Sequence, residues 1–190
     1  QVTADGKFYD YIKTDGLTVD KNNPSHQLNA YYNGIWGKTT IDLNTDLYFS
    51  TNRAYAYSDE QSQEHDSRNI NSKNRVSNKM VATKLVITSP LLGGNLSYGA
   101  EYINTHRNDD YEVNRTDLLA NSYSKLEEQT ASPFIQYAHL TPIGNITAGL
   151  RYEYVRFKYY DAGIYQPEQS RSFRNLFPTI SYGAKIGKVM

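Results

Sequence analysis

The chain has 190 residues, 20 basic and 20 acidic side chains, and no cysteine. The absence of cysteine excludes disulfides, thiolate metal sites and cysteine nucleophiles, and the zero net charge indicates no nucleic-acid partner. Hydrophobic residues make up 38% of the sequence, and 18 residues are tyrosine. Counted without tyrosine and with glycine, the apolar content is about 35%, which is low for a globular domain, at about 45–50% by the same count. No stretch of the sequence approaches the roughly 20 apolar residues of a membrane-spanning helix.

Eight segments of the chain are predicted to be β-strands. The clearest lies at 39–52, where Ile41 and Leu43 occupy odd positions and Asp42 and Asp46 occupy even positions. A period of two predicts a strand with one apolar and one polar face. The segment is also long enough to cross a bilayer on a tilt, which takes about 9–11 residues. The predicted strands are residues 2–12, 26–36, 39–52, 77–89, 95–106, 126–141, 145–160 and 174–187.

The connections between these strands are of two kinds. Short turns containing glycine are predicted at 37–38, 92–95, 142–145 and 187–188, because glycine and asparagine adopt the positive φ that tight hairpins need. Long polar loops are predicted at 53–77, 106–125 and 161–174. Short turns at one end and long loops at the other are typical of outer-membrane barrels. The predicted fold class is therefore all-β, an antiparallel transmembrane β-barrel segment of about eight strands.

Three phrases in the last third of the chain resemble a known family. Gly149–Tyr154 reads GLRYEY, Arg174–Tyr182 reads RNLFPTISY, and Ser132–His139 reads SPFIQYAH. In this order and spacing they are similar to strands of TonB-dependent outer-membrane receptors. The resemblance covers about residues 126–190, and the rest of the chain is similar only in architecture. It implies a protein of the bacterial outer membrane that binds and admits a scarce nutrient.

The resemblance also implies partners. Such receptors have about 22 strands around a plug, so we interpret residues 1–190 as part of one barrel domain whose plug and other strands are absent. The implied partners are outer-membrane lipid, the remaining strands and plug, TonB acting through that plug, and a small-molecule, peptide or glycan substrate. Two alternatives stay open: a complete small eight-stranded barrel with a structural or adhesive role, and a soluble carbohydrate-binding β-sandwich.

Several polar and aromatic residues are candidates for ligand binding in the lumen or at the rim. Alternate positions on one strand point to the same side, so Arg151 and Glu153 are expected to face the lumen together. The competing interpretations are charge ladders that only stiffen the wall and an aromatic girdle at the membrane interface. The full candidate set is Asp42, Asp46, Glu101, Arg151, Glu153, Tyr159 and Tyr160.

The sequence gives little indication of an enzyme or of a metal site. The four histidines lie in different predicted segments, without the HExxH spacing of a zinc protease, and no GxSxG motif is present. The pairs His65-Asp66 and Asp109-Asp110 are interpreted as solvated loop residues. We therefore predict no catalytic residue, no metal ligand and no cofactor, with an outer-membrane hydrolase as a remote alternative.

Overall fold

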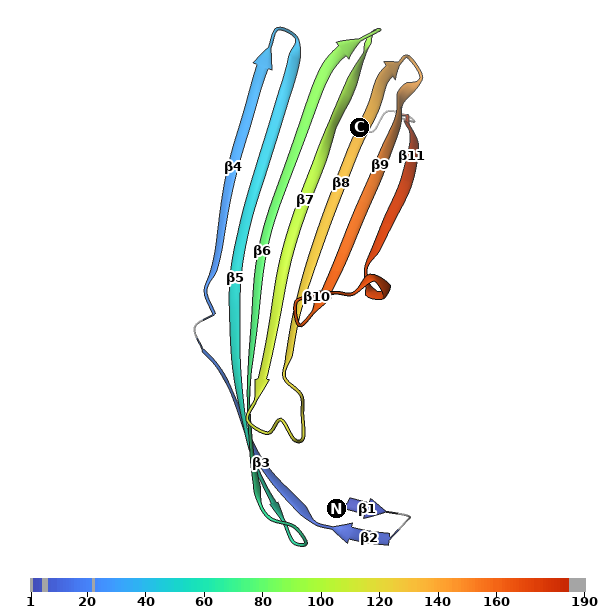
Figure 1. Cartoon of the computed structure of the whole chain (residues 1–190). Coiled ribbons are helices and arrows are strands. Elements are labelled where there is room, and N and C mark those ends of the chain that lie inside the picture. Colours follow the sequence, from blue (N-terminus) through green and yellow to red (C-terminus); the bar gives the residue numbers. More distant parts are fainter. Residues whose placement is uncertain (1, 5–6, 22, 185–190) are drawn as a thin grey trace, which may run out of the picture.

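The computed structural model describes residues 2–4, 7–21 and 23–184. They form strands joined mostly by tight turns, with one short 3-10 helix, η1 (Pro167–Gln169), beside the last strand (Figure 1). Among the described residues no helix is long and apolar enough to cross a membrane. The strands are β1 (Val2–Ala4), β2 (Lys7–Asp10), β3 (Ile12–Asp20), β4 (Ser25–Trp36), β5 (Thr39–Ser62), β6 (Arg68–Leu91), β7 (Gly94–Val113), β8 (Ser122–Thr141), β9 (Gly144–Asp161), β10 (Ile164–Tyr165) and β11 (Arg171–Gly183).

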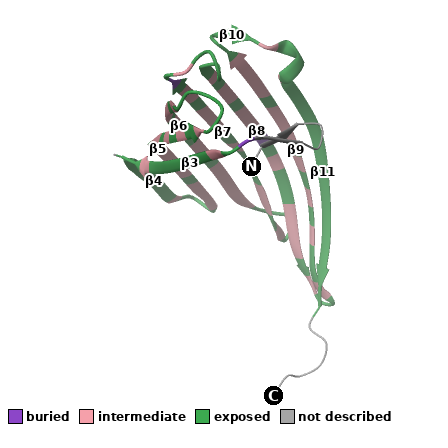
Figure 2. Ribbon diagram, turned by 90° about the horizontal axis from the view of Figure 1, so that it is seen from below, coloured by how far each residue is buried: buried purple, intermediate pink, exposed green. Residues whose placement is uncertain are grey.

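Nine of these strands form one antiparallel sheet, and β1 and β2 form a separate small hairpin. The sheet follows the chain, because β5 to β9 pair in sequence order. β3 and β4 pair with successive parts of β5 at one edge, while β10 and β11 pair with β9 at the other. No described pairing joins the two edges, and the sheet bends like a segment of a barrel wall (Figure 2). The described strands do not form the two packed sheets that a β-sandwich requires.

The register of the sheet separates apolar from polar side chains. One row of directly opposed residues runs Ile41, Ile87, Tyr98, Ile135 and Leu150 across five strands. A row on the opposite side of the sheet, three residues further along β5, contains Asn44, Lys84, Glu101 and Ser132. We call these sides the apolar face and the polar face. The alternation predicted for residues 39–52 is confirmed.

The apolar face has no covering layer among the described residues. Among all described residues the single buried hydrophobic one is Val113, which lies on the polar face, whereas on the apolar face Ile135 is 48% exposed and Ile180 is 86% exposed. A soluble protein rarely exposes so much contiguous apolar surface. Side chains of this kind are stable when lipid covers them, as on the outer side of a membrane barrel.

Three of the predicted tight turns, at 37–38, 92–95 and 142–145, lie at one end of the sheet, and a further tight turn at Ala162-Gly163 joins β9 to β10 at the other end. Gly37 has φ 63°, and Leu92 and Gly93 have φ 48° and 76°, so both residues of the second turn are left-handed. A turn of this type matches the twist of the two strands it joins. The turn predicted at 187–188 lies outside the described residues.

Two sequence predictions about the other end were wrong. The long loops predicted at 53–77 and 106–125 are mostly strand, since β5 and β6 pair from Glu60 and Arg68 onward and β7 and β8 pair from Tyr111 and Ser122. Backbone hydrogen bonds between strands do not depend on side-chain polarity, so a polar segment still forms a ladder once its partner is adjacent.

The predicted strand 2–12 was also wrong. Residues 2–4 and 7–10 form the separate pair β1 and β2, and the segment that pairs with β5 is β3, which the sequence does not predict as a strand. β5 has 24 residues, which corresponds to about 80 Å of extended chain. Since crossing the hydrocarbon takes about 9–11 residues, much of this strand extends beyond the membrane.

Candidate functional site

The first candidate cluster lies on the polar face of β4 and β5. The register places Asn29 opposite Asp46 and Asn33 opposite Asp42. The amide of Asn29 donates to Asp46 at 2.7 Å, and Asn33 donates to Asp42. The hydroxyl of Tyr31 also donates to Asp42, at 3.0 Å. Both predicted carboxylates therefore accept hydrogen bonds from neighbouring side chains within the wall.

The second cluster joins three predicted residues from β7 and β9. A guanidinium nitrogen of Arg151 lies 3.1 Å from a carboxylate oxygen of Glu101 and 3.6 Å from one of Glu153. Because Glu101 is on β7, the Arg151 side chain crosses over the intervening strand β8. Ser132 on that strand is fully buried, and its hydroxyl has no hydrogen-bond partner. A small residue at this position leaves room for the arginine to reach its second carboxylate.

These two clusters share one face but do not form one site. Lys84 on β6 lies between them, directly opposite Asn44 on one side and Glu101 on the other. The structure thus places Asp42, Asp46, Glu101, Arg151 and Glu153 together on the polar face, along a ladder that spans several strands.

The two adjacent tyrosines of β9 lie on opposite faces. Tyr159 is on the polar face, in the same alternation as Arg151 and Glu153. Tyr160 is on the apolar side, where its ring lies 5.3 Å from the Lys125 ammonium and 5.6 Å from the ring of Tyr165. The two hydroxyls therefore do not line a common surface.

A hollow of about 540 Å³ lies on the polar face near the long-connection end, and no sequence pattern predicts it. Val155, Phe157 and Phe173 supply apolar side chains, and the loop carrying η1 covers them with Glu168 and Gln169. Glu128 and Arg171 also line the hollow. One signal was present in the sequence: in the aromatic run of 152–160, alternation alone assigns Phe157 and Tyr159 to the polar face.

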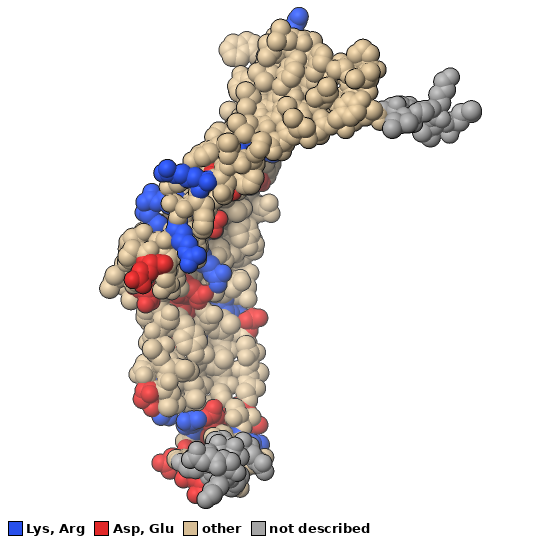
Figure 3. Space-filling view, turned by 90° about the vertical axis from the view of Figure 1, so that its right-hand side faces the viewer, with Lys and Arg blue, Asp and Glu red and all other residues tan. Residues whose placement is uncertain are grey.

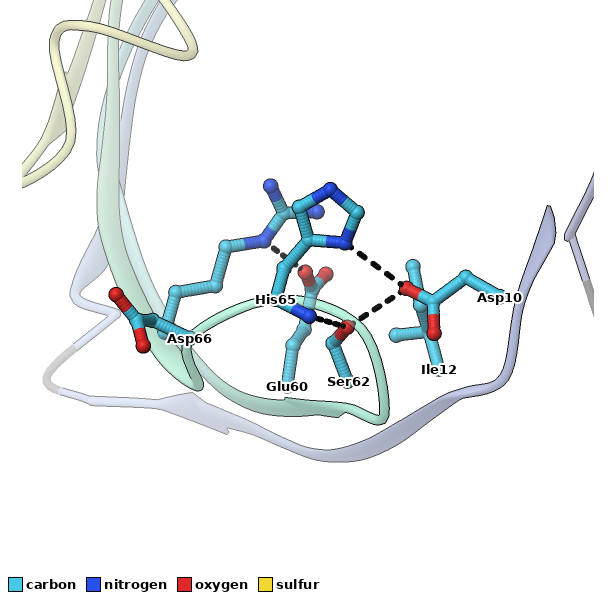
Figure 4. A pocket seen from close by; sticks show the side chains of 7 residues that line it. Asp10, Ile12, Glu60, Ser62, His65 and Asp66 are labelled. Atoms are coloured by element: carbon cyan, nitrogen blue, oxygen red, sulfur yellow. Dashed lines mark hydrogen bonds and ion pairs between the residues drawn. The ribbon is translucent and has the colours of Figure 1, made fainter.

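A second pocket, of about 210 Å³, lies where β2 meets the β5–β6 turn (Figure 4). The buried carboxylate of Asp10 accepts a hydrogen bond from the Ser62 hydroxyl at 2.7 Å and lies 3.5 Å from Nδ1 of His65. The hydrogen bond from the Ser62 hydroxyl is the main reason why the pKa of Asp10 is lowered. A hydrolytic triad instead places histidine between serine and aspartate. This geometry therefore stabilises a turn rather than activating a nucleophile.

The described residues contain no group of three or more histidine, aspartate or glutamate side chains arranged to hold a metal ion. Several acidic residues of the long-connection end pair with basic neighbours. Arg115, for example, donates to both carboxylate oxygens of Asp117 at 2.8 and 2.6 Å. This hydrogen bonding lowers the pKa of Asp117 to about 2.

Comparison with known protein families agrees with the two-faced sheet. The model of the outer membrane protein beta-barrel family matches residues 17–189. The chain therefore belongs to the outer membrane protein beta-barrel family, and it is a protein of the bacterial outer membrane. Its apolar face is the lipid-facing side of the wall, and its polar face is the lumen side. No curated protein matches the chain.

Solved structures with the same fold are outer-membrane transporters and receptors. The copper transporter OprC superposes with a TM-score of 0.51 at 9% identity, over 96% of this chain and 39% of that protein. The alcaligin outer-membrane receptor FauA from Bordetella pertussis gives 0.45 at 11% identity, over 94% of this chain and 33% of that protein. The chain thus spans well under half the length of either protein, and the likeness concerns the fold.

Proposed function

We propose that this chain forms part of the barrel wall of a TonB-dependent receptor that binds a scarce nutrient and admits it across the outer membrane. The family match and the fold shared with OprC support a transport barrel. The resemblance of the three phrases within residues 132–182 to TonB-dependent receptors supports the energy-coupled class. In this proposal other strands close the barrel and a plug fills its lumen.

The observation that carries a binding role is the hollow on the lumen face. It combines the rings of Phe157 and Phe173 with the charged groups of Glu128 and Arg171, beneath the loop that carries η1. Ligand sites are usually concave, lined mainly by apolar and aromatic side chains, and supplied with a few polar groups that orient the ligand. We infer that substrate entering from outside contacts this surface first.

We propose a separate role for the lumen residues predicted from the sequence. Asp42, Asp46, Glu101, Arg151 and Glu153 lie further along the lumen face, toward the end with short turns. Their side chains are partly exposed and face the barrel interior, so we propose that they contact the plug or the passing substrate. Tyr159 belongs to the lumen-side rim, whereas Tyr160 contacts Lys125 outside it.

The proposed function can be tested without knowing the substrate, by measuring which compounds cells remove from their growth medium. Strains that express or lack the full-length protein are grown in defined medium, each with TonB intact and with TonB deleted, and the medium is followed by mass spectrometry for organic compounds and metals. We expect at least one compound to be depleted only when both the protein and TonB are present. Depletion that is independent of TonB, or the absence of any such compound, contradicts the proposal.

A lumen variant links the activity to the hollow. Phe157→Ala removes one aromatic wall, and loss of a buried contact of this kind typically weakens binding by about tenfold or more. The matched control is Tyr152→Ala, which removes a ring from the lipid face of the same strand. Equal uptake by the two variants contradicts a binding role for the hollow.

A further inference from the structure

On the lipid face, apolar side chains are followed by basic side chains at one level of the wall. On β6 the apolar Val81 is followed on the same face by Lys79, and on β9 Tyr154 is followed by Arg156. On β11 Leu176 is followed by Arg174 in the direction of the long connections. On these three strands, therefore, the first residue beyond the apolar belt is a cation. We call Lys79, Arg156, Lys158 and Arg174 the basic belt.

The basic belt has little internal neutralisation. Lys79 and Arg156 are exposed, and within the described part of the chain neither forms an ion pair with a carboxylate. Arg174 on the edge strand β11 is exposed, and its guanidinium lies over the ring of Tyr154, 5.8 Å from the ring centroid. Glu127, the acidic residue of this level, lies directly opposite Lys158, pairs with Lys125 at 2.6 Å and lies 3.7 Å from Nδ1 of His106. Lys158 therefore has a carboxylate opposite it, whereas Lys79 and Arg156 do not.

The position of the belt matters more than its total charge, since the whole sequence has zero net charge. In Figure 3 the upper part of the molecule, at the end with the short turns, is almost free of charge, and lysine and arginine side chains gather just below it, with some acidic side chains among them. Short turns mark the periplasmic end of an outer-membrane barrel. The belt therefore lies at the level where the hydrocarbon of the outer leaflet ends.

We propose that the basic belt binds the phosphate groups of phosphorylated lipid headgroups in the outer leaflet. Charge complementarity supports this occupant, because exposed cations directly beyond an apolar belt meet the anionic headgroups of the lipids that cover the belt. Arginine binds phosphate through two parallel N–H donors, and lysine adds a point charge. The belt thus anchors the wall at a defined depth, independently of what the lumen transports.

Lipid binding by the full-length protein tests the proposal. The probes are lipid A with two phosphates and the same lipid after dephosphorylation, each titrated into detergent-solubilised protein and counted by native mass spectrometry. We expect the wild-type protein to prefer the phosphorylated lipid. The triple variant Lys79→Gln, Arg156→Gln, Arg174→Gln should bind it about a hundredfold more weakly, since each cation near an anionic surface contributes roughly a fivefold effect.

A matched triple variant controls for total charge. Lys13→Gln, Lys21→Gln and Lys73→Gln remove three cations from strands and a turn far beyond the belt, and this variant should keep the wild-type preference. Equal binding of the two lipids by wild-type protein overturns the proposal, even if the belt variant does not fold. An equal loss in both triple variants also overturns it. Displacement of the lipid by millimolar inorganic phosphate overturns it as well, because that result indicates a site for free anions.

Discussion

Small side chains allow larger ones to cross the lumen face of this wall. Ser132 lies beneath the path by which Arg151 reaches Glu101, and Gly99 lies beneath the ring of Phe134 on the neighbouring strand. A glycine under an aromatic ring of the adjacent strand is a known way to fix the register of a curved sheet. At the scale of single residues, the packing of the wall therefore depends on small residues at the positions that larger side chains cross.

Gly99→Ala tests this dependence. A Cβ at this position would overlap the backbone carbonyl oxygen of Leu85 and would lie 3.2 Å from the Phe134 ring. Because a backbone atom cannot move aside cheaply, we expect a loss of about 1–3 kcal/mol in the free energy of unfolding. Urea titration of the protein in liposomes measures this value.

Gly16→Ala is the control for that measurement. Its nearest neighbour would be the Tyr57 carbonyl oxygen at 3.9 Å, an ordinary contact, so we expect little change. Equal stability of the two variants contradicts the proposed close packing at Gly99.

The contact between Asp10 and the β5–β6 turn should depend on pH. The carboxylate accepts hydrogen bonds from Ser62 and from the backbone N–H groups of Gln63 and Glu64, at 2.7, 3.2 and 3.3 Å. These bonds lower the pKa of Asp10 below its ordinary value of 3.8 in the folded protein. For a group whose pKa falls on folding, the stabilisation is present above the unfolded value and is lost as the pH falls through the folded value.

We therefore expect the protection factors of the Gln63 and Glu64 amides to be constant near neutral pH and to fall below about pH 4. In the Asp10→Asn variant, the protection factors of these two amides should be as low at every pH as those of the wild-type protein at acid pH. Hydrogen exchange corrected for the intrinsic rate measures both effects. Asp66→Asn, which changes an adjacent carboxylate of the same pocket, is expected to leave the protection unchanged; a similar loss in that variant would argue against a specific role for Asp10.

At the scale of elements, the strands continue well past the membrane. β5 and β6 remain paired as far as Glu60 and Arg68, and β7 and β8 remain paired as far as Tyr111 and Ser122. Most of their side chains there are polar, as expected for a wall with water on each side. The loop with η1 and the lumen hollow lie at the other edge of the sheet, on β8, β9 and β11, at the level of Arg156.

Hydrogen exchange tests the extension. If residues 53–62 and 68–77 are paired strands, their amides should exchange at least roughly a hundredfold more slowly than those of an unstructured peptide. Residues 81–88 of β6, which carry the apolar belt, provide the internal reference for full protection. If residues 53–62 and 68–77 exchange at the intrinsic rate, they are not paired strands, and the long loop predicted from the sequence is correct.

At the scale of the whole molecule, stability depends on two different environments for the two faces. Leu85 lies on the lipid face opposite Leu43 and Ala100, whereas its neighbour Val86 lies on the lumen face opposite Asp42 and Gly99. Substitutions at these two adjacent residues therefore test the lipid face and the lumen face separately.

Leu85→Lys should destabilise the protein by about 2–4 kcal/mol, which is the cost of placing lysine near the centre of the lipid face of a barrel. Val86→Lys adds the same charge opposite a carboxylate on the water side and should cost clearly less. Unfolding in liposomes compares the two variants. Equal losses would mean that the assignment of the two faces is wrong.

The sequence alone determined the parts of this protein where the surroundings of the two faces differ. Where lipid covers one side and water the other, as around Leu43 and Asp42, each residue has only one acceptable face, so alternation is visible in the sequence. Glycine positions likewise predicted the tight turns, because few other residues adopt positive φ without strain. The fold class and the lumen-facing ladder could therefore be predicted.

The tertiary structure decided what alternation does not encode. Beyond the membrane both faces are in water, so the paired parts of β5 and β6 show no pattern and resemble loops in the sequence. Contacts between distant strands were also hidden: the sequence placed Arg151 beside Glu153, but its closer partner is Glu101 on β7, across the strand that carries Ser132. Register is a property of the assembled sheet, and it brought these residues, the lumen hollow and the basic belt together.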